Sequence, residues 1–224
     1  MKYIIMCGGK YKYWKTPKQL QEVYGQPIVQ WTIWYLFDAG VHPHDIFISS
    51  NDSRFDGFGV ERLKHNNTFE TDGKKMKGYW VDGFYPMDEP VTYLYGDVLY
   101  TRKAIETIVN SKTNYVLMFG SFNLNRKDNL KEWEEPYGFK VVNTRVFKAG
   151  IEACKELKDE GLTKREPISW ELYRLINGYP VNKHIIKDNY VPIDDLTTDF
   201  DTKEELKKFK EMYVKDEIYG PHFS

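Results

Sequence analysis

The segment YIIMCGGKYKYWKTPKQL, residues 3–20, joins a short apolar run to a loop rich in glycine and lysine. The run Tyr3–Cys7 is almost free of polar residues, which is typical of a strand covered on both faces of a parallel sheet. An apolar helix is predicted from about 28 to 39, where Gly40 ends it, and a second strand at 46–48. This opening predicts a βαβ unit with a right-handed crossover.

The same order of strand, loop and helix recurs along the chain. Residues 51–90 show little periodicity and are expected to form loops and short elements that cover a site. Further strands are predicted at 91–95, 115–119 and 139–142, and helices at 102–110, 145–160, 168–177 and 203–212. We therefore expect one α/β domain over residues 1–224, a three-layer α/β/α sandwich with a mostly parallel central sheet.

The loop after the first strand has the composition of an anion site. Gly8 and Gly9 allow positive φ angles and close approach of a ligand, so successive amide N–H groups can face an anion. Positive charge comes from four lysines within nine residues: Lys10, Lys12, Lys15 and Lys18. The loop matches neither the GxxxxGK[ST] nor the GxGxxG pattern. The residues alone predict an anion-binding loop, and the alternative is a solvated turn after an ordinary strand.

A wider pattern surrounds this loop. The glycine pair, the basic loop, PKQL at 17–20 and GQPIVQWTIWYLFDAG at 25–40 together resemble the opening signature of the nucleotidyltransferase superfamily of GT-A-like fold. That superfamily includes cytidylyltransferases acting on sugar, polyol and choline phosphates. The resemblance implies triphosphate contacts from Cys7, Gly8 and Gly9, and a lysine near the α-phosphate at Lys18. Here the loop is shorter than usual, and Lys10 or Lys12 replaces the usual arginine.

Two acidic positions extend the resemblance. Asp97 follows the strand at 91–95, and the stretch DFDTKEEL at 199–206 resembles the closing DxDTxEDL signature of cytidylyltransferases. The resemblance implies that Asp97 and Asp201 hold Mg²⁺, with Asp199 in support, since Mg²⁺ is commonly bound by one or two carboxylates and substrate phosphates. The alternative for Asp97 is a turn or helix cap. For the second motif it is a capping box, either Asp201 with Glu204 or Thr202 with Glu205.

Other charged and polar residues are weaker candidates. Asn51 ends the second predicted strand and is expected near the ribose or base, although a turn is the alternative. Lys74 lies where relatives contact the nucleobase. Arg126 and Lys140 are candidates for the acceptor phosphate, against the alternative of solvated surface charges. The resemblance thus divides the chain into a nucleotide-binding half, 1–120, and an acceptor-binding half with a closing helix, 121–224.

Composition excludes several classes of partner. Lysines and arginines (32) nearly balance aspartates and glutamates (33), so no overall field favours nucleic acid or an anionic membrane. No apolar run reaches membrane-spanning length, and the two cysteines show no metal-ligand spacing. We expect a cytoplasmic protein, and the oligomeric state is left open, with a homodimer as one alternative.

The resemblance implies a Mg²⁺-dependent enzyme that transfers a nucleoside monophosphate, CMP favoured over UMP, to a phosphorylated small molecule and releases pyrophosphate. One alternative is a glycosyltransferase of the same broad fold that uses a nucleotide sugar. Its DxD motif normally follows a central strand, whereas the second aspartate is missing after Asp97. A second alternative is a nucleotide-binding protein without activity.

Overall fold

The computed structural model describes residues 1–11, 14–65, 70–71, 76–121 and 134–212. Within them a seven-stranded sheet has the order β13 (Tyr190–Ile193), β11 (Val116–Ser121), β12 (Pro136–Val141), β9 (Val91–Tyr95), β1 (Lys2–Met6), β5 (Ile46–Ser49) and β6 (Glu61–Leu63). The β12 strand runs antiparallel to β9 and β11, and the other neighbours are parallel. The mostly parallel sheet is thus confirmed.

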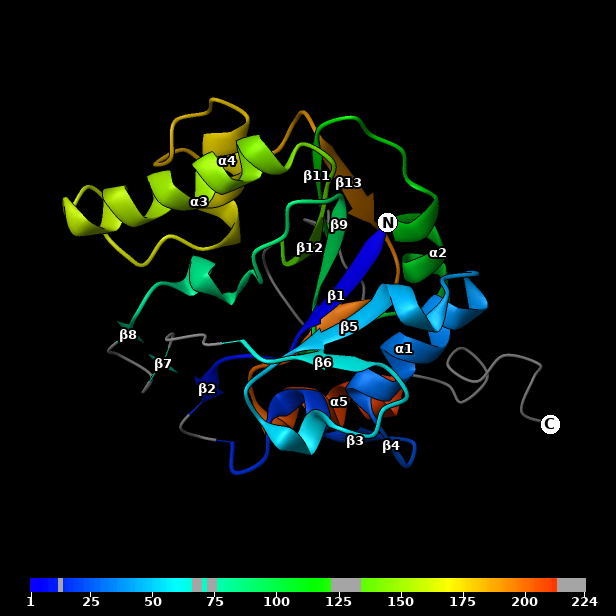
Figure 1. Cartoon of the computed structure of the whole chain (residues 1–224). Helices are drawn as coiled ribbons and strands as arrows, with labels where there is room; N and C mark the ends of the chain where they lie inside the picture. The colour runs from blue at the N-terminus through cyan, green and yellow to red at the C-terminus, as the bar shows by residue number, and fades with distance from the viewer. Residues whose placement is uncertain (12–13, 66–69, 72–75, 122–133, 213–224) are drawn as a thin grey trace.

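Helices cover both faces of the sheet. Figure 1 shows α1 (Ile28–Asp38) and α2 (Arg102–Asn110) on one side and α3 (Thr144–Asp159) and α4 (Ser169–Ile176) on the other. The contacts α1 with α2 and α3 with α4 agree with this arrangement. The predicted α/β/α sandwich is confirmed. Helix α5 (Lys203–Met212) lies at the edge where β1 ends.

Local signals define the helix limits. The Thr101 hydroxyl accepts from the backbone N–H of Ala104 at 3.0 Å and starts α2, as Ser, Thr, Asp and Asn caps commonly do. The Asn143 side chain starts α3 in the same way. Gly40, with φ of 85°, ends α1 in a conformation that glycine adopts without strain. These helices therefore match the predicted limits to within one or two residues.

Several short elements were not predicted individually. Strands β6 and β13 extend the main sheet at its two edges, while β10 (Val98–Leu99) pairs with β14 (Thr198–Asp199). A small sheet joins β2 (Lys10–Tyr11), β7 (Glu70–Thr71) and β8 (Met76–Lys77), and β3 (Glu22–Val23) pairs with β4 (Gln26–Pro27). The 3₁₀ turns are η1 (Lys18–Leu20), η2 (Pro43–Asp45), η3 (Ser53–Phe55) and η4 (Trp80–Gly83). Two-residue strands carry too little periodicity to be recognised in a sequence.

The core fills the space between the sheet and the α3–α4 pair with aromatic rings. Phe84 packs edge-on against Phe139 and Phe147, with ring centroids 5.7 and 5.0 Å apart, and Tyr93 stacks on Phe147 at 5.6 Å. Such contacts add to the stabilisation from burial. None of the helices in the described part is long and apolar enough to span a bilayer.

Lys140 does not have the predicted role in acceptor binding. Its side chain is 3% exposed, and its ammonium group donates to the carbonyl oxygens of Val109 and Ser111 at 3.0 and 2.7 Å. Lys140 pairs with Thr92 near the start of β9, at the sheet edge opposite to Asp97. The lysine therefore satisfies carbonyl groups at the end of α2, where helical acceptors lack partners.

Replacing Lys140 with methionine is expected to lower the free energy of unfolding by about 1–3 kcal/mol, because buried carbonyl groups lose their donor. Burial lowers the pKa of Lys140 to about 8, below the 10.5 of an unperturbed lysine. Between about pH 8 and pH 10.5, the unfolded chain therefore binds this proton more fully than the folded protein does. The free energy of unfolding of the wild type rises with pH in that range.

The methionine variant lacks that rise, so the stability difference between the two proteins widens as the pH is raised. Urea unfolding at about pH 7.5 and about pH 9.5 measures the difference in free energy of unfolding between the wild type and Lys140→Met. Lys103→Met, on the exposed face of α2, is the control and should leave stability within about 0.5 kcal/mol of wild type.

Candidate active site

The end of β9 is packed directly against the end of β1. Gly96 donates its backbone N–H to the Met6 carbonyl at 3.0 Å. A Cβ atom on Gly96 would come within 2.6 Å of that carbonyl oxygen and 2.7 Å of the Cys7 sulfur. The close packing at this position thus requires glycine. Asp97 follows at the carboxyl edge of the sheet, where ligands of open α/β sheets bind.

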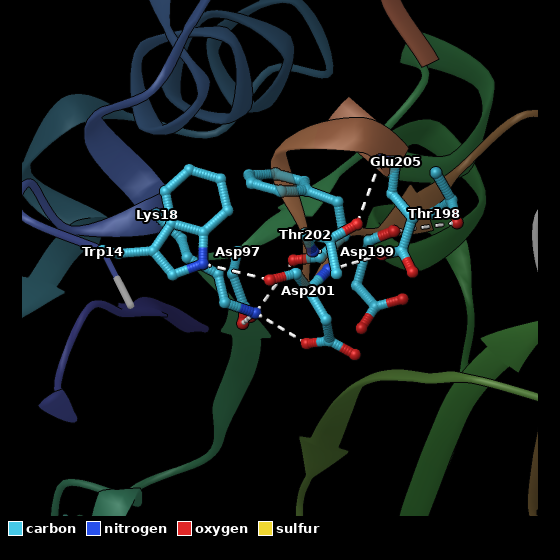
Figure 2. A network of polar contacts seen from close by, with 9 residues as sticks. Trp14, Lys18, Asp97, Thr198, Asp199, Asp201, Thr202 and Glu205 are labelled. Atoms are coloured by element: carbon cyan, nitrogen blue, oxygen red, sulfur yellow. Dashed lines mark hydrogen bonds and ion pairs between the residues drawn. The ribbon is translucent and has the colours of Figure 1, made fainter. Parts of the chain in front are cut away.

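Lys18 lies at the centre of the site. It begins η1, its side chain is only 1% exposed, and its ammonium nitrogen donates to three acceptors: Asp97 Oδ2 at 3.0 Å, Asp201 Oδ1 at 2.9 Å and the Phe200 carbonyl at 2.9 Å. A lysine ammonium has three N–H donors. The loop after β1, the end of β9 and the closing motif therefore meet at one nitrogen, as Figure 2 shows.

Three contacts bring the closing motif to this place. The antiparallel pair β10–β14 sets Asp199 opposite Val98, directly after Asp97. The Phe200 ring is buried, and the Trp14 ring packs edge-on against it at 5.6 Å. Trp14 also donates its indole N–H to the Asp201 carbonyl at 3.0 Å. Through Trp14, the second half of the lysine-rich loop is therefore held against the closing motif.

The capping box predicted as an alternative is also present. The Thr202 hydroxyl accepts from the Glu205 backbone at 3.1 Å, and the Glu205 carboxylate accepts from the backbone N–H groups of Thr202 and Asp201 at 3.3 and 2.6 Å. Thr202 and Glu205 therefore begin α5 between them. Of the two capping boxes that the motif predicted, the one formed by Thr202 and Glu205 is therefore confirmed.

The carboxylates fit the donor set of Mg²⁺. The paired oxygens of Asp97 and Asp201 are each about 3 Å from one nitrogen, so they lie within about 6 Å of each other. Among the described residues, no group of three His, Cys, Asp or Glu side chains lies close enough to hold a metal ion. A magnesium ion here would need oxygens from a bound phosphate as well, which is its usual mode of binding in phosphate-transferring enzymes.

A cleft of about 280 Å³ opens over this edge of the sheet. One part is formed by Gly8, Gly9, Gln19 and the aspartates. The other part, which we call the far wall, includes Trp80, Glu134, Arg165 and Trp170. The lining residues are Met6, Gly8, Gly9, Gln19, Trp80, Gly83, Tyr95, Asp97, Val98, Glu134, Glu135, Pro136, Arg165, Ile168, Ser169, Trp170, Asp199 and Asp201. Gly9 has φ of 89°, which bears out the need for glycine in the loop.

Residues on the far wall were missed by the sequence analysis. Trp80 comes from η4, and Arg165 and Trp170 come from the loop before α4 and its first turn. Trp170 falls in the helix predicted at 168–177, but periodicity does not tell which side chains line a cleft, so only the folded chain shows that these three residues share one with the glycine pair.

The remaining predicted residues have different outcomes. Cys7 is buried and does not line the cleft; burial and the nearby Asp97 carboxylate raise the pKa of its thiol well above the usual value, so it is not a thiolate nucleophile. Asn51 is exposed and outside the cleft lining, and the adjacent Asp52 accepts from the Arg54 N–H, as in an Asx turn. The side chain of Lys10, and Lys12, Lys74 and Arg126, lie outside the described residues.

Comparison with known proteins identifies the fold. No family model matches the chain, and no curated protein matches it significantly. The structure resembles 4-diphosphocytidyl-2C-methyl-D-erythritol synthase from Anaerococcus prevotii, with a TM-score of 0.54, 9% identity, and coverage of 94% of this chain and 97% of that one. It also resembles CTP:phosphocholine cytidylyltransferase from Streptococcus pneumoniae, with a TM-score of 0.53, 13% identity and the same coverage. The chain has the fold of nucleotidyltransferases.

Replacing Lys18 with methionine is expected to destabilise the chain by about 1–3 kcal/mol, the usual cost of leaving buried polar groups without partners. The loss should stay below that of a fully enclosed ion pair, because the Asp201 side chain is 61% exposed.

Asp201→Asn is the matched comparison. It keeps an Oδ1 acceptor for Lys18 and removes the charge of a side chain that is 61% exposed, so its effect should be smaller than that of Lys18→Met. Chemical denaturation measures both variants, and a larger loss for Asp201→Asn than for Lys18→Met would contradict the central place of the lysine.

Proposed function

We propose that this chain is a nucleotidyltransferase, which transfers a nucleoside monophosphate from a triphosphate to a phosphorylated small molecule. The observation that carries the proposal is the cluster of Lys18, Asp97 and Asp201 beside Gly8 and Gly9 in one cleft. A loop able to bind phosphate, a buried cation and two carboxylates are the parts that nucleotidyl transfer needs, since this reaction depends on positioning and charge neutralisation.

Each part has a proposed task toward the triphosphate. The backbone N–H groups of Gly8 and Gly9 face phosphate oxygens, with further charge from the lysines of the loop. Asp97 and Asp201, supported by Asp199, hold Mg²⁺, which supplies positive charge to the phosphate oxygens. Lys18 offsets the charge that grows on the α-phosphoryl group, and its bonds to both aspartates hold the ammonium in place before substrate binds.

The acceptor phosphate is the nucleophile in this proposal. One of its oxygens forms a bond to the α-phosphorus, the bond from that phosphorus to the bridging oxygen breaks, and pyrophosphate leaves. A phosphate monoester is already ionised near neutral pH, so a general base is not required.

CTP is the favoured donor. Support comes from the DFDTKEEL motif and from the two similar structures described above. One is named as a diphosphocytidyl-methylerythritol synthase and the other as a CTP:phosphocholine cytidylyltransferase. Sugar, polyol and choline phosphates are the acceptor classes to test, and a cytoplasmic location fits such substrates.

Replacing Asp97 with asparagine should lower turnover at least about 10³-fold, because charge neutralisation at the triphosphate is lost. The assay combines each of the four triphosphates with Mg²⁺ and a panel of phosphorylated acceptors, and follows pyrophosphate. Removal of Mg²⁺ by a chelator should stop the reaction as well.

Asp194→Asn is the matched control, because Asp194 is exposed and outside the cleft lining; its turnover should stay at the wild-type level. Wild-type activity in Asp97→Asn would overturn the assignment. Release of a free nucleoside diphosphate from nucleotide sugars would favour a glycosyltransferase, and triphosphate binding without any product would favour a binding protein.

A further inference from the structure

The cleft has an unusual distribution of charge. Arg165 is the single lysine or arginine among the described residues that line the cleft, whereas five carboxylates line it. Lys18 is already engaged by Asp97 and Asp201. Among the described lining residues, Arg165 is therefore the cation that an acceptor phosphate bound at this wall would contact. A guanidinium group suits this contact, because its planar fork can bind phosphate through two parallel hydrogen bonds.

Arg165 is anchored by a buried carboxylate. Its Nη2 donates to the two Glu171 oxygens at 3.1 and 3.4 Å, and the Glu171 side chain is 8% exposed. Glu171 also accepts from the Ile168 backbone at 3.0 Å and from Arg174 at 3.4 Å. The Arg165 side chain itself is 57% exposed. One end of this guanidinium is thus held while the rest is accessible to a ligand.

The same network continues to a second residue of the wall. Arg174 donates to His184 Nδ1 at 3.0 Å, and His184 Nε2 lies 3.1 Å from a Glu134 carboxylate oxygen. Because a guanidinium can only donate, Nδ1 must be the acceptor and the ring proton is on Nε2. His184 therefore donates to Glu134, which leaves the Glu134 carboxylate in the cleft as an oriented acceptor.

We propose that Arg165 and Glu134 are the acceptor-binding residues of the far wall, an inference that rests on the proposed function. Arg165 binds the acceptor phosphate, and Glu134 accepts a hydrogen bond from an amine or hydroxyl group on the organic part. Both side chains line one cleft and are linked through Glu171, Arg174 and His184. Rings of Trp80 and Trp170 form the apolar surface of the same wall. The substrate class is a phosphate monoester with a polar, donor-bearing organic part.

Arg165→Gln tests the phosphate contact. It should raise the acceptor KM about ten- to a hundred-fold, the range for loss of a charge-assisted hydrogen bond, while the triphosphate KM stays within about two-fold. Arg165→Lys should recover part of the loss, since it keeps the charge but not the fork. Lys164→Gln is the control, because Lys164 is exposed, next in sequence and outside the cleft lining. An unchanged acceptor KM in Arg165→Gln would overturn the assignment.

A titration with inorganic phosphate, without nucleotide, separates this proposal from the proposed function. Calorimetry should show weaker phosphate binding in Arg165→Gln than in wild type and Lys164→Gln, with melting temperatures confirming that all three are folded. Equal binding in the three proteins would refute the role of Arg165. If no acceptor yields pyrophosphate with the wild type, the proposed function fails, and this titration still decides on Arg165.

Glu134→Gln tests the second contact through substrate preference. Wild type should prefer phosphates of amino alcohols or polyols to a simple alkyl phosphate about ten-fold or more, and the variant should lose most of that preference. Glu160→Gln, an exposed change at the end of α3, should keep it. An enzyme that uses alkyl and donor-bearing acceptors equally well, or a variant with the wild-type ranking, would exclude this role of Glu134.

Discussion

The ion pairs of Lys18 are the interaction on which the site depends. The ammonium group of a lysine whose side chain is 1% exposed is costly to bury unless oxygens surround it. Asp97, Asp201 and the Phe200 carbonyl provide these oxygens from segments 79 to 183 residues away. The same bonds that offset burial therefore fix the distance between the glycine loop, the end of β9 and the closing motif.

The same cluster is the centre of the proposed reaction. Among the described residues, two carboxylates contact one ammonium at a sheet edge that opens into a cleft. The proposed binding of Mg²⁺ and phosphate groups rests on this arrangement of carboxylates. Thr202 and Glu205 form the capping box at the start of α5. The sequence left open whether this pair or Asp201 with Glu204 would form it.

The two walls of the cleft are built in different ways. Gly8 and Gly9 follow directly from the end of β1, whereas the side chains of the far wall are positioned by hydrogen bonds and ion pairs with other residues. There, Glu166 accepts from the Trp80 backbone at 2.9 Å and pairs with Lys158, while Glu171 holds Arg165. Hydrogen bonds and ion pairs of this kind hold the side chains of the wall in place.

Much of the fold was contained in local patterns. Helices α2 and α5 begin and end where the sequence predicts them, and the motifs around Lys18, Asp97 and Asp201 were recognisable because each spans only a few residues. The antiparallel direction of β12, the β10–β14 pair, the position of Lys140 at the end of α2 and the presence of Arg165 in the cleft were not predictable. Periodicity and capping report on neighbours along the chain, whereas these features depend on contacts between residues that are distant in sequence, and only the tertiary structure determines those contacts.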